Sequence, residues 1–328
     1  MADNASEIPA QAAESHAAGA ERPRTASTAS TTPAARTTWL AALAQRSLSA
    51  LVLIPIVVAL VFCGGWFAFA GCVLALIISI SELNAMFTHK GWHPPLLLSA
   101  ALGIDFLLAA MLFVLNHNAT LLLLLVGGGV SALLMLTFAW LILTRGALEG
   151  ALIDWALTMG SAFYLGWPLA LFILLRGDTF GAGATGFWWL LALFFMTWAN
   201  DTFALLTGHY FGRAKLAPNI SPGKTWEGFF GGLVFTVIAS FVFTILLPDL
   251  FQHPLPINWL NAAILGVLVA LASTVGDLAE SLLKRGTGVK DSGTIVPGHG
   301  GLLDRMDSLL FVVPVVFFYA IFLRGTPL

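Results

Sequence analysis

Long apolar runs constrain the fold of this chain more than any other feature of its sequence. From about residue 47 onward, segments of mostly apolar residues alternate with short polar breaks. A helix needs roughly 20 apolar residues to cross the hydrocarbon core of a bilayer. Inside that core the backbone must satisfy its own polar groups, and long uninterrupted runs do so as helices and not as strands of a closed barrel. The sequence therefore predicts an all-α fold, a polytopic bundle of transmembrane helices.

About nine segments have the length of a membrane span. They are residues 47–63, 65–87, 96–115, 119–144, 151–175, 184–211, 226–247, 257–285 and 308–323. Only 10% of the 328 residues are charged, whereas a soluble domain is about 25% charged. Most of the outer surface is therefore expected to face lipid.

Residues 1–38 have a different composition from the rest of the chain. They are rich in Ala, Ser, Thr and Pro and hold almost no large apolar side chains. Such a segment cannot bury enough apolar surface to offset the entropy lost on ordering, so we expect a disordered tail. It lacks the charged start and short apolar core of a cleaved signal peptide. Residues 39–328 are expected to form one transmembrane domain.

Lysines and arginines are divided unevenly between the two sides of the predicted bundle. If the N-terminus is cytosolic, the opposite side holds only Arg176 and Arg324. The cytosolic side then holds Arg46, Lys90, Arg145, Arg213, Lys215, Lys224, Lys284, Arg285, Lys290 and Arg305. Because cytoplasmic loops carry the excess of positive charge, this asymmetry predicts a cytosolic N-terminus and a C-terminus outside.

Net charge and cysteine content exclude two classes of partner and site. A formal net charge of −2 leaves no broad basic surface for nucleic acid. The two cysteines, Cys63 and Cys72, lie in apolar stretches, without zinc-site spacing or a disulfide framework. We expect both to be buried free thiols.

Charged residues are concentrated in two clusters near the predicted cytosolic side, and we expect both clusters to line one site. Charged groups inside a membrane protein are costly and usually functional. The first cluster holds Asp201, Arg213, Lys215, Lys224 and Glu227. The second holds Asp277, Glu280, Lys284, Arg285, Lys290, Asp291, Asp304, Arg305 and Asp307.

The end of the 257–285 segment is the most informative part of the second cluster. Asp277, Ser281 and Lys284 are spaced four and three residues apart, so they share one helical face, with Glu280 beside it. If the helix ends near Arg285, Asp277 lies about 12 Å below that end. This depth implies a water-filled cavity, a metal ion or a partner charge. The alternative is a structural ion pair between Asp277 and Lys284.

The loop that follows combines glycines with charges of both signs. Glycines let backbone amides approach an anion, and lysine or arginine neutralises phosphate. Asp304 and Asp307 offer hard oxygens suited to Mg²⁺, which usually takes one or two carboxylates together with substrate phosphates. Alternatively, Ser308, Asp304 or Asp307 caps the helix predicted to begin at residue 308. The combination favours a metal–nucleotide site.

Two motifs in these clusters resemble the signature of the phosphatidate cytidylyltransferase (CDP-diacylglycerol synthase) family. The first is Ser281-Leu-Leu-Lys284-Arg285, then Lys290-Asp291, then His299-Gly300-Gly301-Leu-Leu-Asp304-Arg305-Met-Asp307. The second comprises Asn200-Asp201-Thr202, Phe211-Gly212-Arg213 and Ser221-Pro222-Gly223-Lys224-Thr225-Trp226-Glu227-Gly228.

The resemblance implies a membrane enzyme that joins CTP and phosphatidic acid to give CDP-diacylglycerol and pyrophosphate. It makes Asp277 and Asp304 the Mg²⁺ ligands, with Ser281 and Lys284 as further catalytic residues of a catalytic domain at 39–328. It also implies a multi-pass protein of a bacterial-type inner (plasma) membrane whose active site faces the cytosol. A homodimer is left open.

Six further residues are candidates for substrate binding, each with a structural alternative. Lys290 and Arg305 either contact phosphate or serve as positive-inside anchors. His299 either donates a hydrogen bond to a phosphate or makes a hydrogen bond within the loop. Asp201 either binds metal or substrate, or is a polar helix-packing residue paired with Asn200. Ser221 and Lys224 are candidates for a second anion contact, and Lys224 also suits a lipid phosphate.

Two rival functions remain open from the sequence. Intramembrane charges also mark the ion pathways of secondary transporters. However, such a protein is expected to show inverted repeats, whereas these charges gather on one side of the bundle. A CTP-dependent lipid kinase would use similar electrostatics and transfer the terminal phosphate instead.

Overall fold

The computed structural model describes residues 54–144, 149–177, 185–246, 255, 257–293 and 300–324. The predicted tail and the start of the first predicted span lie outside these residues, as does His299. Eight helices in the described part are long and apolar enough to cross a membrane. The all-α prediction is confirmed, and the chain is a multi-pass membrane protein.

The eight spans follow one another with short connections. They are α2 (Gly65–His89), α3 (Leu96–Asn116), α4 (Ala119–Thr144), the continuous α5 (Ala151–Ser161), η1 (Ala162–Gly166) and α6 (Trp167–Arg176), α7 (Thr185–Phe211), α8 (Trp226–Phe241) with η3 (Val242–Leu246), α10 (Trp259–Thr287) and α11 (Leu303–Arg324). A shorter apolar helix, Ile54–Cys63, precedes α2 and is the described part of the first predicted span.

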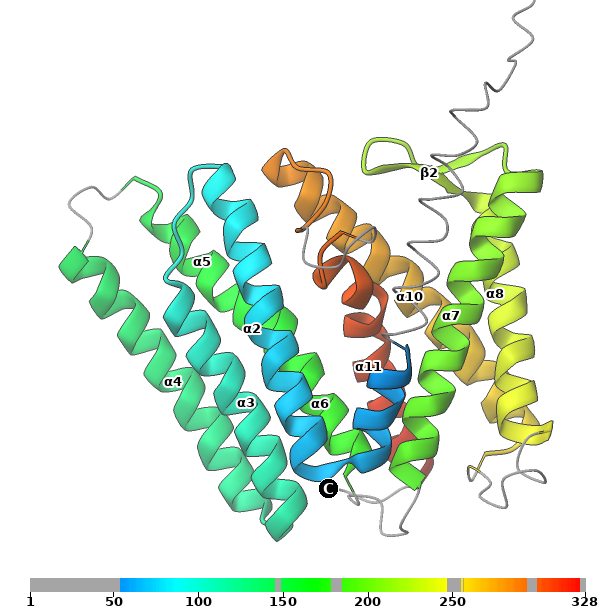
Figure 1. Ribbon diagram of the computed structural model, residues 1–328, viewed down its shortest axis with the longest axis horizontal. Helices are drawn as coiled ribbons and strands as arrows, with labels where there is room; N and C mark the ends of the chain where they lie inside the picture. The colour runs from blue at the N-terminus through cyan, green and yellow to red at the C-terminus, as the bar shows by residue number, and fades with distance from the viewer. Residues whose placement is uncertain are drawn as a thin grey trace, which may run out of the picture. The chain divides into compact units, whose positions relative to one another are not determined.

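A small hairpin joins α7 to α8 and was not expected from the sequence. Its strands are β1 (Lys215–Ala217) and β2 (Ser221–Thr225), which pair antiparallel with Lys215 opposite Thr225. Thr225 then caps the start of α8, because its side chain accepts a 3.1 Å hydrogen bond from the Gly228 amide. The hairpin and the end of α10 lie at the same end of the bundle (Figure 1).

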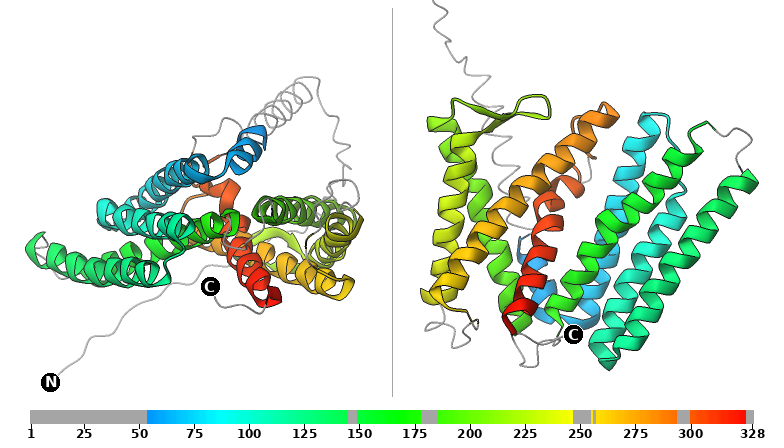
Figure 2. Two further views of the ribbon diagram at one scale, coloured as in Figure 1. Left: turned by 90° about the horizontal axis from the view of Figure 1, so that it is seen from below. Right: turned by 180° about the vertical axis from the view of Figure 1, so that it is seen from behind.

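The helices fall into two neighbouring groups with α11 between them. In both lateral views α7, α8 and α10 lie on one side of α11, while α2, α3, α4, α5 and α6 lie on the other (Figures 1 and 2). α11 packs against α10 and α6. The apolar core of the bundle includes the buried side chains of Leu107, Leu165, Trp189, Leu190 and Phe317.

Local signals set the limits of α10, the helix on which the site depends. Asn258 caps its start, since its side chain accepts a 2.9 Å hydrogen bond from the Asn261 amide. Gly288 ends it in the left-handed conformation with φ of 80°, which glycine adopts without strain. The helix therefore reaches Thr287, so Asp277 and Lys284 both lie within its last turns.

Two expectations from the sequence are wrong in detail. The last helix begins at Leu303 rather than at residue 308, so Ser308 lies inside α11 and does not cap it. The cause is that Asp304, Arg305 and Asp307 interrupt the apolar pattern although they are helical. Cys63 is exposed and not buried, whereas Cys72 is buried as expected.

Candidate active site

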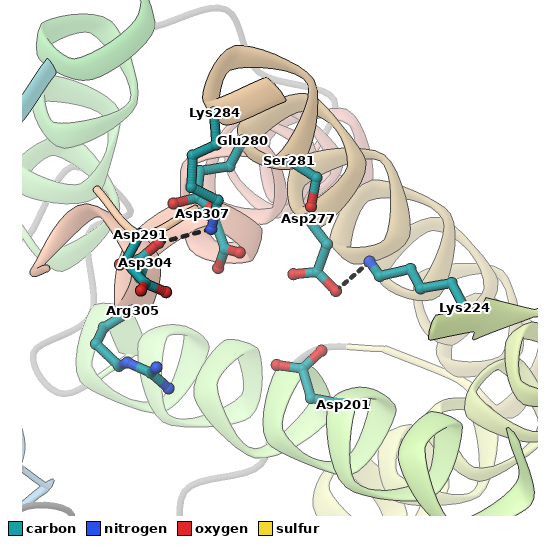
Figure 3. Close-up of a pocket in the computed structure, with 10 residues that line it drawn as sticks. All are labelled: Asp201, Lys224, Asp277, Glu280, Ser281, Lys284, Asp291, Asp304, Arg305 and Asp307. Atoms are coloured by element: carbon teal, nitrogen blue, oxygen red, sulfur yellow. Dashed lines mark hydrogen bonds and ion pairs between the residues drawn. The ribbon is translucent and has the colours of Figure 1, made fainter. Parts of the chain in front are cut away.

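A polar cavity of about 350 Å³ is lined by α7, the base of the hairpin, the last turns of α10 and the start of α11 (Figure 3). Its lining consists of Asp201, Lys224, Asp277, Glu280, Ser281, Lys284, Asp291, Asp304, Arg305 and Asp307. Asp201 comes from α7, Lys224 from β2, four residues from α10, Asp291 from the following segment and three residues from α11. The fold thus brings together the two charged clusters that lie far apart in the sequence.

Asp277 holds the centre of one half of the cavity. Its Oδ2 is 2.5 Å from the Nζ of Lys224 on the hairpin, and its Oδ1 accepts a hydrogen bond from the hydroxyl of Ser308. Asp307 interacts with the carboxyl group of Asp277, and the negative charge of Asp277 also acts on Asp201. The predicted alternative, an ion pair between Asp277 and Lys284, is therefore wrong, because Lys224 is the partner.

Lys284 organises the other half of the cavity. Its Nζ lies 2.7 Å from Glu280 Oε2, one turn away on α10, and 2.7 Å from Asp304 Oδ1 on α11. The second oxygen of Asp304 accepts hydrogen bonds from the amides of Ser292 (3.1 Å) and Gly301 (2.9 Å). Lys284 and the turn before α11 thus hold Asp304 from both sides.

A buried polar network fixes Asp201 at the edge of the cavity. The hydroxyl of Ser273 on α10 donates to Asp201 Oδ1 at 3.1 Å. The Ser273 hydroxyl in turn accepts a 3.0 Å hydrogen bond from the side-chain Nδ2 of Asn200. The side-chain Oδ1 of Asn200 accepts a hydrogen bond from the Thr236 hydroxyl on α8 at 3.3 Å. Because α7, α8 and α10 all contribute, the position of Asp201 is set by tertiary packing.

The cavity carries more negative than positive charge. Six of its side chains are carboxylates and three are cationic. Oε1 of Glu280 is buried and accepts no hydrogen bond from the described residues. Crowded carboxylates repel one another unless a cation lies between them. The cavity therefore suits a bound cation.

The donor chemistry narrows the kind of cation. Carboxylate oxygens are the ligands that Mg²⁺ takes, usually one or two together with substrate phosphates. Within the described ranges, no group of three or more His, Cys, Asp and Glu side chains is arranged to hold a metal ion by itself. The carboxylates present are thus of the kind that Mg²⁺ takes, and they would supply only part of its ligands.

Two predicted substrate-binding residues, Ser221 and Lys290, are not part of the cavity lining, and a third is not among the described residues. Ser221 pairs with Ala217 at the far end of the hairpin, whereas Lys224 lies at its base, where it reaches α10. Lys290 is exposed just beyond the end of α10. His299 lies outside the described residues. Their roles in substrate binding stay predictions.

Comparison with known proteins identifies the family. A family model described as "Cytidylyltransferase family" matches residues 44–323. The chain belongs to this cytidylyltransferase family.

Individual relatives show both a short, very similar region and full-length similarity. An uncharacterized protein of Escherichia coli, YnbB, is 47% identical over 108 residues, 33% of this chain and 34% of the relative. A phosphatidate cytidylyltransferase of Bacillus subtilis is 45% identical over 107 residues, 33% of this chain and 38% of the relative. One of Pseudomonas aeruginosa is 34% identical over 295 residues, 83% of this chain and 95% of the relative. The chain thus spans little more than a third of the first two relatives and nearly all of the third.

Three cavity residues belong to the second charged cluster but not to the residues that the resemblance makes catalytic or metal-binding: Glu280, Asp291 and Asp307. A signal for Glu280 was present, since Asp277, Glu280, Ser281 and Lys284 follow the i, i+3, i+4, i+7 spacing of one helical stripe. Asp307 was predicted to be either a Mg²⁺ ligand or a cap of a helix starting at residue 308, and it lies inside α11, which begins at Leu303. Asp291 belongs to the first family motif beside Lys290, but the motif alone gave it no specific role.

Proposed function

We propose that this chain transfers the cytidylyl group of CTP to phosphatidic acid, giving CDP-diacylglycerol and pyrophosphate. The observation that carries the proposal is the cavity itself. It combines cationic and carboxylate side chains at the polar end of membrane helices, where a water-soluble nucleotide and a membrane lipid can both reach it. Full-length relatives that carry the name phosphatidate cytidylyltransferase support this substrate pair.

The reaction needs positioning more than proton transfer. An oxygen of the phosphatidate phosphate forms a bond to the α-phosphorus of CTP, the bond from that phosphorus to the α–β bridging oxygen breaks, and pyrophosphate leaves with the electron pair. A phosphate monoester is already anionic at neutral pH, so the attacking oxygen needs no general base. Catalysis then depends on holding two anions together and stabilising charge at the transferred phosphorus.

The cationic side chains supply the contacts to these anions. Lys284 and Arg305 lie toward α11 and are proposed to bind the triphosphate, where Arg305 can offer a bidentate contact. Lys224 on the hairpin is proposed to bind the lipid phosphate. Because Lys224 is paired with Asp277 in this structure, substrate binding would exchange that carboxylate for a phosphate oxygen.

Asp277 and Asp304 are the residues proposed to hold Mg²⁺. When bound, the ion neutralises triphosphate oxygens and stabilises the charge that develops during transfer. Asp307 and Asp201 lie close enough to Asp277 to share its electrostatic environment. Ser281, one turn beyond Asp277, adds a hydroxyl to the cavity wall.

The cavity is proposed to face the cytosol of a cell whose plasma membrane holds the protein. The uneven distribution of lysine and arginine supports this orientation. Single cysteines introduced at Lys290 or Arg324, with both native cysteines, Cys63 and Cys72, replaced by serine, test it in sealed vesicles of known sidedness. Labelling of position 290 from the outside alone would reverse the orientation.

Position-specific labelling of CTP tests the reaction. Purified protein is incubated with phosphatidic acid and with CTP labelled at either the α- or the γ-phosphorus. We expect the α label in the lipid product and the γ label in pyrophosphate. Label from the γ position in the lipid would instead indicate a lipid kinase, and no lipid label from either position would contradict both.

A further inference from the structure

A buried carboxylate on α2 lies outside the cavity yet binds the segment that carries Asp304. Glu82 is only 4% exposed, and it does not line the cavity. Its Oε1 accepts a 2.9 Å hydrogen bond from the Leu302 amide, and its Oε2 accepts one of 2.9 Å from the Leu303 amide. Oε2 also lies 3.3 Å from the hydroxyl of Ser292, which donates to it. No salt bridge to Glu82 is present among the described residues, so backbone amides compensate its charge.

The amides that Glu82 binds are those at the start of α11. The first N–H groups of a helix have no partner inside the helix, and they carry partial positive charge. A local side chain usually satisfies them, but here the carboxylate comes from a helix 220 residues earlier in the chain. Asp304 follows immediately, in the first turn of α11. Glu82 therefore determines where this first turn lies relative to α2.

Glu82 and Asp304 hold the same short segment from two directions. Ser292 donates its hydroxyl to Glu82 and its amide to Asp304. At Gly301 an added Cβ would lie 2.6 Å from Glu82 Oε2 and 2.1 Å from the Ser292 hydroxyl, and at Gly293 it would lie 2.8 Å from Glu82 Oε1. These two glycines thus allow the backbone to close around the Glu82 carboxylate.

We propose that Glu82 is a positioning residue for the transfer reaction, because it fixes the start of α11 and thereby the carboxylate of Asp304 in the cavity. This inference rests on the proposed function for its catalytic consequence. Glu82 itself touches none of the cavity-lining side chains in the hydrogen bonds described, so its effect passes through Ser292 and the α11 backbone. A shift of about 1 Å in such a group is enough to cost roughly 100-fold in rate.

The test compares Glu82→Gln with a matched variant elsewhere. Glu82→Gln keeps the length of the side chain but presents an NH₂ group to one of the two amides, where a donor meets a donor. The control is Asp154→Asn on α5, since Asp154 is also a buried carboxylate (1% exposed) that accepts a backbone hydrogen bond, 2.8 Å from the His93 amide. Asp154 does not line the cavity.

Two readouts on the full-length protein separate positioning from general stability. Amide hydrogen exchange of the peptide containing Leu302 and Leu303 reports whether Glu82 holds these two amides, an interaction called the Glu82 clamp below. This readout needs no enzymatic activity. Turnover with CTP and phosphatidate, across a Mg²⁺ titration, reports its consequence. We expect Glu82→Gln to speed exchange in this peptide and to lower kcat about 10- to 100-fold, with more Mg²⁺ needed for half-maximal rate. Asp154→Asn should leave both near wild type.

The outcomes distinguish this inference from the proposed function. Unchanged exchange in Glu82→Gln would show that the Glu82 clamp does not hold the start of α11. Faster exchange with a kcat equal to that of Asp154→Asn would show that the clamp plays no part in the reaction. If the wild-type protein forms no CDP-diacylglycerol, the proposed function fails and the exchange data alone decide the clamp. If Glu82→Gln does not fold, Ser292→Ala, which removes one donor to Glu82, is measured instead, and wild-type exchange and kcat in that variant overturn the proposal.

Discussion

Helices α4 and α10 are both long apolar spans, yet they have opposite relations to their surroundings. α4 holds no charged residue, and its side chains Leu123 (72% exposed) and Leu143 (84% exposed) are uncovered. The helix lies at the edge of the bundle (Figure 2). α10 packs against α7, α8 and α11, and its last turns carry Asp277, Glu280 and Lys284 into the cavity. Apolar length thus predicts a span, whereas charges buried on a protein-facing stripe predict a function.

The largest effect is expected from the two carboxylates assigned to the metal. Asp277→Asn and Asp304→Asn should each lower turnover by about 1,000-fold or more, because metal stabilisation contributes several kcal/mol and each 1.4 kcal/mol is tenfold. Steady-state formation of CDP-diacylglycerol measures this. A variant that keeps even a tenth of wild-type turnover would remove that carboxylate from the metal site.

The next largest effect is expected at Lys284. Replacing it with methionine removes a proposed phosphate contact worth roughly 2–4 kcal/mol in the transition state, or a loss of roughly 30- to 1,000-fold in kcat/KM. Because Lys284 also neutralises Glu280 and Asp304, the thermal stability of the Lys284→Met protein in detergent is measured alongside its activity. Lys284→Arg keeps the charge and should recover part of the rate. Near-normal activity in Lys284→Met would make this residue a structural anchor only.

Asp307 is expected to have an intermediate effect. It lies within α11 beside Asp277 and lines the cavity, so Asp307→Asn should lower turnover by roughly 30- to 100-fold through the shared electrostatics. A helix-capping role would instead cost about 1 kcal/mol of stability and leave turnover nearly unchanged. Comparing kcat with the thermal unfolding temperature of the variant distinguishes these roles.

The smallest effect comes from one substitution made in both helices. At Gly276 of α10 an added Cβ would lie 2.6 Å from the Asp307 carbonyl oxygen, whereas at Gly127 of α4 it would meet nothing within 4 Å. Gly276→Ala should separate α10 from α11 and lower turnover by about tenfold. Gly127→Ala should leave turnover unchanged and stability equal or slightly higher. Equal turnover in the two variants would contradict the contrast between the helices.

The sequence predicted the spans well because membrane thickness sets their length. Side-chain partners were harder to predict, since spacing along one helix does not reveal what another element brings to it. Lys224 became the partner of Asp277 through a hairpin whose strand contains Pro222 and Gly223, which are poor strand formers. Glu82 and the start of α11 are likewise 220 residues apart, so only the folded chain reveals their contact.

The central claim is that Asp277 and Asp304 act as one unit with a divalent cation at the end of α10. The most direct measurement is CDP-diacylglycerol formation by the wild-type protein, the two single Asp→Asn variants and the double variant across a Mg²⁺ titration. We predict no activity in chelator and a double variant barely worse than either single one, because residues that act as a unit are strongly non-additive. Full activity in chelator, or losses at Asp277 and Asp304 that multiply independently, would contradict the account.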